Sequence, residues 1–238
     1  MTVSQTARHP RAWQRLKPAA VAVAGWAIDL VFPPVCWHCG RPDVRSCADC
    51  QRRLDAVAVR CLPRQVDQLE TVYATGAHDG ALKSAVQAFK YAGATELAGS
   101  LAQRLIHALA QVNLPVDTIV PVPLHARKQA ERGYNQAKLL CNVLAAELDM
   151  PCEPGWLQRV RNTRQQAQLT SAERESNVKG AFEAVGDASG RAFLLVDDVV
   201  TTGATLSDCA RALRNAGAAA VFGIVVSMPQ STAKNAGR

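Results

Sequence analysis

Residues 193–206 constrain the fold of this 238-residue chain more than any other stretch. The run 193–196, Phe-Leu-Leu-Val, is continuously apolar, which indicates a central parallel strand covered on both faces. Asp197 and Asp198 interrupt the run where we expect the strand to end. Open sheets bind ligands at the carboxyl ends of their strands. The sequence therefore predicts two carboxylates at a ligand-binding edge.

A polar loop and a helix follow these acids. Residues 201–205, Thr-Thr-Gly-Ala-Thr, supply hydroxyls, backbone N–H groups and a glycine that permits close approach. The pattern predicts a helix over 206–215, closed by Gly217. Amides at a helix N-terminus and the helix dipole favour an anion. These residue types predict a sugar-phosphate site, with the acids on the ribose hydroxyls and the amides on the phosphate. The alternative is a strand–turn–helix whose acids only cap the helix.

The order of these residues resembles the motif with which type I phosphoribosyltransferases bind phosphoribosyl pyrophosphate (PRPP). Four apolar residues, two aspartates, two further apolar residues and Thr-Thr-Gly follow one another without a gap. The stretch is not a Walker loop, because the chain contains no G-x-x-x-x-G-K-[ST] pattern.

Four cysteines lie within fifteen residues, at positions 36, 39, 47 and 50. Two Cys-x-x-Cys pairs can bring four thiolates to one tetrahedral zinc ion, which leaves no position for a substrate and so predicts a structural site. The seven-residue gap between the pairs requires a tight hairpin. Four unligated thiols are the alternative, and His38 or Cys61 could substitute as a ligand. The eight cysteines do not suggest a secreted disulfide scaffold, so we expect a reducing cytoplasm.

Length and composition suit a globular domain with a smaller module. The net charge of +7 favours anionic ligands: phosphate, pyrophosphate or nucleic acid. Residues 19–32 are nearly all apolar, but Asp29 breaks the run and it is too short for a transmembrane segment. We expect a short helix packed on the protein there, with a membrane-surface anchor as the alternative.

The remaining chain alternates strand and helix patterns. We expect strands at 72–76, 117–123 and 221–227, helices at 79–91, 94–112 and after 136 as far as about 149, and a helix with a linker at 51–68. Lys90 lies between two aromatic residues, and it either forms part of a solvated helix face or reaches the phosphate end of the site.

Two basic segments flank the predicted site. Prolines end the strand at 117–123 and stiffen the loop beyond it, where basic residues suit a pyrophosphate: His125, Arg127, Lys128 and Arg132. Residues 157–182 are rich in arginine and glutamine. We interpret them as a hood that closes over a phosphorylated ligand. The alternative is a surface loop with a short helix at 171–177.

From residue 31 to residue 227 the chain resembles the ComF family of competence-associated, phosphoribosyltransferase-like proteins. The segments that carry the resemblance are Pro-Pro-Val-Cys-Trp-His-Cys-Gly at 33–40, Cys-x-x-Cys at 47–50, Phe-Lys-Tyr at 89–91, Val-Pro-Val-Pro at 120–123, Arg-Gly-Tyr-Asn-Gln at 132–136, Arg-x-Arg-x-Thr-x-x-Gln-x-x-Leu at 159–169, Arg-x-x-Asn-x-x-x-Ala-Phe at 174–182, and the Asp-Asp and Thr-Thr-Gly core. Many relatives have a second pair of Cys-x-x-Cys knuckles, whereas this chain has only Cys61 in that region, so one zinc site is expected.

The resemblance implies an α/β fold of the type I phosphoribosyltransferase kind, with a mostly parallel central sheet flanked by helices. We expect a basic tail and short apolar helix at 1–32, a zinc-ribbon-like module and linker at 33–68, the phosphoribosyltransferase domain at 69–230 and a tail at 231–238. The resemblance also implies a PRPP site with magnesium. We assign Asp197 and Asp198 as catalytic; Val199, Thr201, Thr202, Gly203, Ala204, Thr205, Lys90, Pro123, His125, Arg127 and Arg132 to PRPP; and Arg161, Gln166, Arg174 and Asn177 to the hood.

Two functions remain open from the sequence. The chain either transfers or senses ribosyl phosphate, or is a non-catalytic PRPP- or nucleotide-binding accessory that binds single-stranded DNA or DNA-processing partners during transformation. The sequence shows no aromatic array of the kind that stacks successive bases. A purely structural zinc protein would leave the Asp-Asp and Thr-Thr-Gly string unexplained.

Overall fold

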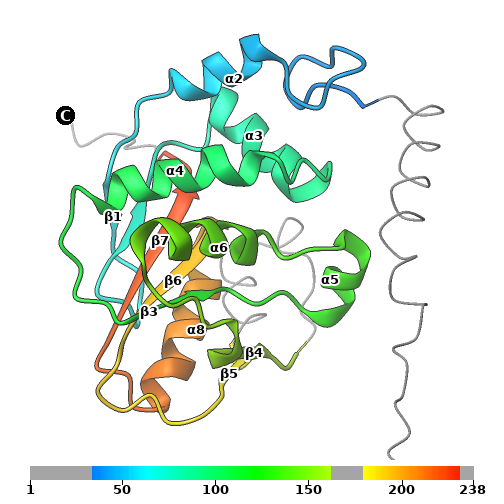
Figure 1. Ribbon diagram of the computed structural model, residues 1–238. Coiled ribbons are helices and arrows are strands. Elements are labelled where there is room, and N and C mark those ends of the chain that lie inside the picture. Colours follow the sequence, from blue (N-terminus) through cyan, green and yellow to red (C-terminus); the bar gives the residue numbers. More distant parts are fainter. Residues whose placement is uncertain (1–33, 162–178, 231–238) are drawn as a thin grey trace, which may run out of the picture.

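A five-stranded sheet forms the centre of the computed structural model, which describes residues 34–161 and 179–230 (Figure 1). The strand order is β1-β2-β7-β6-β3, and only β1 runs antiparallel to its neighbour. The bounds are β1 (Leu62–Arg64), β2 (Val72–Ala74), β3 (Thr118–Pro121), β6 (Ala192–Val199) and β7 (Ala220–Ser227). The sheet is thus mostly parallel, as predicted.

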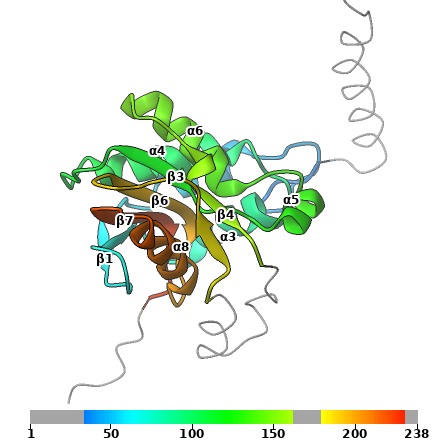
Figure 2. The ribbon, with the colours of Figure 1, turned by 90° about the horizontal axis from the view of Figure 1, so that it is seen from below.

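Helices cover both faces of this sheet. In Figure 2, α8 (Ala204–Asn215) lies on one face, and α4 (Leu97–Leu109) and α6 (Gln136–Leu148) lie on the other. The central strand β6 serves both cores through its alternation: Phe193 and Leu195 join the core under α8, while Leu194 and Val196 join the core under α4 and α6. All four side chains are fully buried, which explains the continuous apolar run.

The other elements complete these layers. They are α2 (Ala48–Asp55), α3 (Gly80–Tyr91), α5 (Ala126–Arg132), a single 3-10 turn (Pro154–Trp156) and the two-stranded sheet of β4 (Leu157–Arg159) and β5 (Phe182–Ala184). The predicted helices at 79–91, 94–112 and 136–149 and the predicted strands are confirmed to within a few residues.

Three local expectations differ from the structure. β6 does not end before the acids but continues to Val199, because β7 stays alongside it and pairs Val199 with Ser227. The expected rigid loop after Pro123 is the helix α5. The segment expected as a linker contains β1, which pairs with β2 at the edge of the central sheet.

Gly203 and Gly217 bound α8, and the role of Gly217 at its end is the one that the sequence predicts. Gly203 is the N-cap with φ 92°, a left-handed conformation that favours glycine. A Cβ on Gly203 would also lie 2.8 Å from the side chain of Val66, so no other residue fits without movement. Gly217, with φ 99°, follows the last turn, and its N–H donates to the Arg214 carbonyl. The helix begins at Ala204, two residues earlier than expected.

A buried arginine joins the cysteine-rich module to the central domain. Arg104, on α4, is 5% exposed, and its guanidinium donates to carbonyl oxygens of Leu54, Val57 and Ala58 at the end of α2 and beyond. It also donates to Thr75 Oγ1 at the end of β2. The division into a module at 33–68 and a domain at 69–230 stays a prediction, but one guanidinium contacts both.

Candidate functional site

A cavity of about 540 Å³ opens at the carboxyl ends of β6 and β3. Eight residues that the sequence assigns to the site line it: Asp197, Asp198, Val199, Thr201, Thr205, Lys90, Pro123 and Arg132. Thr202, Gly203 and Ala204 line a small adjoining hollow with residues shared by both. Segments more than a hundred residues apart in the chain therefore converge at the edge of the sheet where open α/β folds bind ligands.

The acid pair, Asp197 and Asp198, lies at the floor of this cavity. Asp198 is almost fully buried, and its Oδ1 accepts a hydrogen bond from Lys90 Nζ at 2.9 Å. Its Oδ2 is buried without a hydrogen-bond partner among the described residues. A buried acceptor left unpaired costs about 1–3 kcal/mol. Asp198 thus presents a ready acceptor for a ligand hydroxyl.

The pKa of Asp197 is shifted by its surroundings. Asp197 is half-buried, and its Oδ1 accepts the backbone N–H of Asp198 at 2.8 Å. Burial, together with the negative charge of Asp198, raises the pKa of Asp197 to about 7. Burial lowers the pKa of Lys90, but the carboxylates of Asp198 and Asp197 outweigh it and raise that pKa above its ordinary value. Near neutral pH the pair can therefore both donate to and accept from adjacent hydroxyls.

The Thr-Gly loop (residues 201–205) forms the second wall of the site. It leads into the N-terminus of α8, where the first backbone N–H groups of a helix have no intrahelical acceptor. Thr202 Oγ1 accepts the N–H of Ala204 at 3.3 Å, and the Thr201 and Thr205 side chains line the cavity. Such an end binds an anion through backbone groups and the helix dipole.

A cationic wall, which we define as Lys128, Arg132 and Arg159, faces the same cavity. Lys128 and Arg132 lie four residues apart on α5, so they share one helix face. Arg159 comes from β4, and its guanidinium lies 5.1 Å from the centre of the Phe182 ring. Burial lowers the pKa of Lys128, and the charges of Arg159, Arg132 and Lys90 lower it further. The wall therefore favours an anionic ligand.

The Arg-Gly-Tyr-Asn-Gln segment at 132–136 holds the elements around the cavity together. The Tyr134 hydroxyl donates to the carbonyl of Phe89 in α3 at 2.7 Å. The Asn135 side chain donates to the carbonyl of Val122 at 3.0 Å and accepts the N–H of Lys138, so it caps α6. This segment thus ties α3 and the end of β3 to the start of α6.

Gln136 extends this network to the cationic wall. Its buried side-chain amide donates to the carbonyl of Lys90 at 3.3 Å, and its Oε1 accepts from Arg132. The Arg132 guanidinium also lies 5.4 Å from the centre of the Tyr91 ring. Tyr91 is 73% exposed and lies at the rim of the cavity. Arg132 is therefore held in place before any ligand binds.

Three predicted site residues lie elsewhere. His125 caps α5, because its Nδ1 accepts the N–H of Arg127 at 3.2 Å. Arg127 is exposed and forms an ion pair of 2.8 Å with Glu131. Arg161 is exposed and donates to the carbonyl of Lys179 at 3.0 Å. The hood predictions for Gln166, Arg174 and Asn177 lie outside the described residues, as do those for 1–32 and 231–238.

Two cavity residues, Arg159 and His78, were missing from the sequence-based assignment, and Lys128 was expected only as one of the basic residues that suit a pyrophosphate. Lys128 and Arg159 form part of the cationic wall, and His78 lines the cavity with its Nδ1 hydrogen-bonded to Ser227 Oγ at 2.8 Å. Burial lowers the pKa of His78, and Lys83 and Lys90 add to that shift. The helical spacing of four between Lys128 and Arg132 was a usable signal, and Arg159 lies in the arginine-rich segment 157–182, whereas His78 belongs to no local pattern that points to the site.

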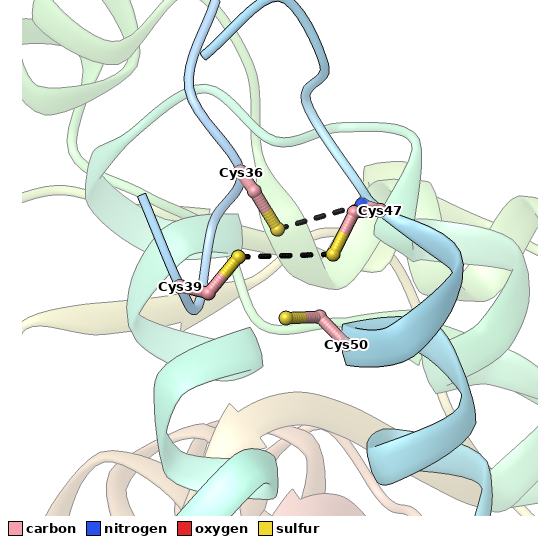
Figure 3. Close-up of side chains that lie close together, drawn as sticks. All are labelled: Cys36, Cys39, Cys47 and Cys50. Carbon is pink, nitrogen blue, oxygen red and sulfur yellow. Dashed lines mark hydrogen bonds between the residues drawn. The ribbon is translucent and has the colours of Figure 1, made fainter. Parts of the chain in front are cut away.

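The four cysteines of the N-terminal module converge on one point (Figure 3). Their sulfur atoms all lie within 4.8 Å of one another, and Cys39 Sγ and Cys47 Sγ are 3.7 Å apart. A tetrahedral zinc ion with bonds of about 2.3 Å holds its sulfurs about 3.8 Å apart. Among the described residues this group comprises the four cysteines alone, without His38 or Cys61. The cluster could therefore hold a metal ion such as zinc.

The acidity of these thiols also fits a metal site. Burial raises the pKa of Cys36, but backbone N–H groups of His38, Cys39 and Cys47 outweigh it and lower the pKa to about 6. Burial and the neighbouring sulfurs raise the pKa of Cys50 to about 12. Four adjacent thiolates repel one another unless a cation lies between them. A bound metal ion supplies that positive charge as it displaces the thiol protons.

Comparison with known proteins agrees with this geometry. A model of the phosphoribosyl transferase domain family matches residues 135–238, which include the acid pair and the Thr-Gly loop. The mostly parallel sheet, with helices on both faces and these residues at its carboxyl edge, is therefore a phosphoribosyltransferase-type fold.

Relatives over most of the chain define the family more closely. The DNA utilization protein YhgH of Salmonella typhi is 32% identical over 217 residues, which cover 81% of this chain and 96% of that protein. The competence protein F of Haemophilus influenzae is 32% identical over 196 residues, 77% of this chain and 80% of that protein. The chain belongs to the ComF family of phosphoribosyltransferase-like proteins.

One solved structure that the chain resembles is titled as the allosteric regulatory enzyme of purine biosynthesis. It is 22% identical, with a TM-score of 0.39 over 58% of this chain and 30% of that chain. Separately, none of the helices within residues 34–161 and 179–230 has the length and apolar character needed to cross a bilayer.

Proposed function

We propose that the chain binds PRPP together with magnesium and transfers its ribosyl phosphate to an acceptor. The observation that carries this proposal is the position of the acid pair directly beside the Thr-Gly loop, in one cavity. The buried and unpaired Oδ2 of Asp198 supplies an acceptor for a ribose hydroxyl, and the N-terminus of α8 supplies donors for a phosphate. A ligand with a sugar and a terminal phosphate matches both.

Each part of the site then has a task. The backbone N–H groups of residues 201–205 bind the 5-phosphate, and Asp197 and Asp198 accept hydrogen bonds from the ribose hydroxyls. Lys90 pairs with Asp198 at 2.9 Å, and its ammonium has further N–H groups with which to bind the diphosphate. Magnesium, when bound, would be held by the phosphate and ribose oxygens and waters rather than by a protein cage, and it would neutralise the leaving group.

The chain's residues favour electrostatic catalysis. The cavity presents fixed positive groups where the diphosphate gains negative charge as its bond to the ribose breaks, and such preorganised charges lower the barrier without reorganising. The carboxylates stand ready to stabilise the positive charge that develops on the ribose. This mechanism requires no covalent nucleophile, and the described residues that line the cavity include no cysteine or serine.

The comparisons favour a second candidate. The relatives are named for competence and DNA utilization, which suggests a non-catalytic accessory that binds PRPP or a nucleotide and acts on single-stranded DNA or a DNA-processing partner. The net charge of +7 is compatible with this role. DNA affinity that falls steeply with salt, in a protein that releases no pyrophosphate from PRPP, would favour the accessory role.

We also propose that the four cysteines bind a structural zinc ion. The module contacts the central domain through Arg104, so loss of zinc should loosen the end of α2 first. Metal analysis of the purified protein should find one zinc per chain. Cys39→Ser should abolish that stoichiometry, whereas Cys61→Ser should retain it.

The site proposal is tested by titrating PRPP and magnesium into the protein and its Asp198→Asn variant. An asparagine keeps the shape of the side chain but places an N–H₂ group where a ribose hydroxyl must donate and removes the partner of Lys90. We expect the affinity to fall by at least about a hundredfold, or 2.7 kcal/mol. Glu147→Gln, on the exposed face of α6, is the matched control. Equal affinities in wild type and Asp198→Asn would reject the assignment.

A further inference from the structure

Two cysteines that take no part in the proposed sites lie next to each other where α6 packs on the central sheet. Cys141 is fully buried in α6, and Cys152 is partly exposed in the segment that follows this helix. Both contribute to the core between α6 and the sheet. The described residues that line the cavity and its adjoining hollow include neither of them, and neither belongs to the four-cysteine cluster.

The chain doubles back directly after α6 ends. Asp149 has φ 49° and reverses the chain, and the N–H of Met150 donates to the carbonyl of Ala145 at 3.2 Å. The next residues run parallel to β3, where the N–H of Glu153 donates to the carbonyl of Ile119 at 3.0 Å. The segment 150–153 is therefore held by hydrogen bonds to both α6 and β3.

This path brings the two cysteines level with each other. The chain runs back along α6, because the N-cap of that helix contacts the carbonyl of Val122 beyond the opposite, carboxyl end of β3. Four residues of helix separate Ala145 from Cys141, a rise of about 6 Å. Two residues of extended chain lead from Met150 to Cys152 and span about 6.6 Å. The geometry therefore places one thiol opposite the other.

The two thiols differ in acidity. The hydrogen bond with Cys141 lowers the pKa of Cys152 to about 7; burial and Glu153 oppose this shift, and the positive charge of Lys138 adds to it. Burial raises the pKa of Cys141 well above its ordinary value. Near neutral pH, Cys152 is therefore partly a thiolate, which is the nucleophilic form, and Cys141 remains a thiol. An accessible, acidic thiol beside a second cysteine is the arrangement that reacts readily with peroxides.

We propose that Cys152 reacts with hydrogen peroxide and then forms a disulfide bond with Cys141. The Cys152 thiolate attacks one peroxide oxygen, the O–O bond breaks and hydroxide leaves, so that the sulfur becomes a sulfenic acid. The Cys141 sulfur then attacks the Cys152 sulfur. The S–S bond forms, and the sulfenic oxygen leaves as water with the thiol proton of Cys141. The two cysteines together lose two electrons, which the peroxide accepts.

The test is to treat the full-length protein with hydrogen peroxide near neutral pH, with zinc present, then to alkylate the remaining thiols and digest with trypsin. Both cysteines fall in one peptide, residues 139–159, because no lysine or arginine lies between them. We expect this peptide to lose the mass of two hydrogen atoms and to escape alkylation. Cys61 is also partly exposed, but burial raises its pKa. It should therefore react at least about tenfold more slowly than Cys152.

Variants separate the two steps of the reaction. Cys141→Ala should stop the reaction at the sulfenic acid, which dimedone traps on Cys152, and Cys152→Ser should leave Cys141 unmodified. Cys61→Ser is the matched control and should form the disulfide at the wild-type rate. Circular dichroism verifies that each variant is folded. The inference is wrong if both cysteines of the wild-type peptide are alkylated after peroxide treatment, or if Cys61 reacts as fast as Cys152.

Discussion

The Thr-Gly loop and the cationic wall face one cavity but are built in different ways. The loop is five consecutive residues whose backbone N–H groups and helix dipole would bind an anion. The wall consists of three side chains from two elements, α5 and β4, that lie up to 31 residues apart in the chain. A backbone site is specified by conformation and tolerates many side chains. A side-chain site is specified by charge and depends on the fold to assemble it.

After Asp198→Asn, the largest expected effect on PRPP affinity comes from the conformation of the loop. Gly203→Ala places a Cβ at φ 92° and within 2.8 Å of the stiff Val66 side chain. Strained conformations of this kind cost about 1–3 kcal/mol, so we expect PRPP affinity to fall by about tenfold or more as the loop moves. Gly155→Ala, where a Cβ would have open space, is the control. Unchanged affinity in Gly203→Ala would show that the backbone conformation of the loop does not determine PRPP binding.

A smaller effect, on stability rather than on PRPP affinity, should arise from the protonation of Asp197. The pKa of Asp197 is raised from 3.8 to about 7, so between these values the folded protein holds a proton that the unfolded chain has lost. The free energy of unfolding should therefore fall as pH rises from 4 to 7. Asp197→Asn lacks this titrating group, so its free energy of unfolding should fall less between pH 4 and pH 7. Urea unfolding measured across that pH range checks this. Parallel curves for wild type and variant would show that Asp197 titrates normally.

The smallest effect should be seen just outside the cationic wall. Arg127 precedes Lys128 in the chain but is exposed, does not line the cavity and pairs with Glu131 at 2.8 Å. Exposed pairs contribute little, so Arg127→Gln should change PRPP affinity by at most about threefold. The affinity is measured by the same titration used for Asp198→Asn. A loss above tenfold would show that the wall extends to the outer face of α5.

The same contrast explains what could be predicted from the sequence. The apolar run of the central strand and the four clustered cysteines are local patterns, and the structure assembles both as expected, although the strand continues through the acids and α8 begins two residues early. Arg159 was not assigned, because its contribution depends on the pairing of β4 with β5 and on Asp208 in α8. No spacing in the sequence reveals that convergence.

The local errors also have physical reasons. The strand β1 is three residues long and contains Pro63. Proline is accepted in an edge strand such as β1, but in a sequence it argues against a strand, so β1 was not predicted. The helix α5 is rich in strong helix formers and begins at a His125 cap, yet the prolines before it suggested a loop. The acids did not end β6, because β7 continues to pair with it beyond them.

The central claim is that the acid pair and the Thr-Gly loop together bind a ribose phosphate. The most direct measurement is the affinity of ribose 5-phosphate, which lacks the diphosphate, for wild type, Asp198→Asn and Lys128→Met. The account predicts that ribose 5-phosphate binds, that Asp198→Asn weakens it by at least about tenfold, and that Lys128→Met leaves it within twofold. Failure of ribose 5-phosphate to bind the folded protein, or equal binding by wild type and Asp198→Asn, would contradict it.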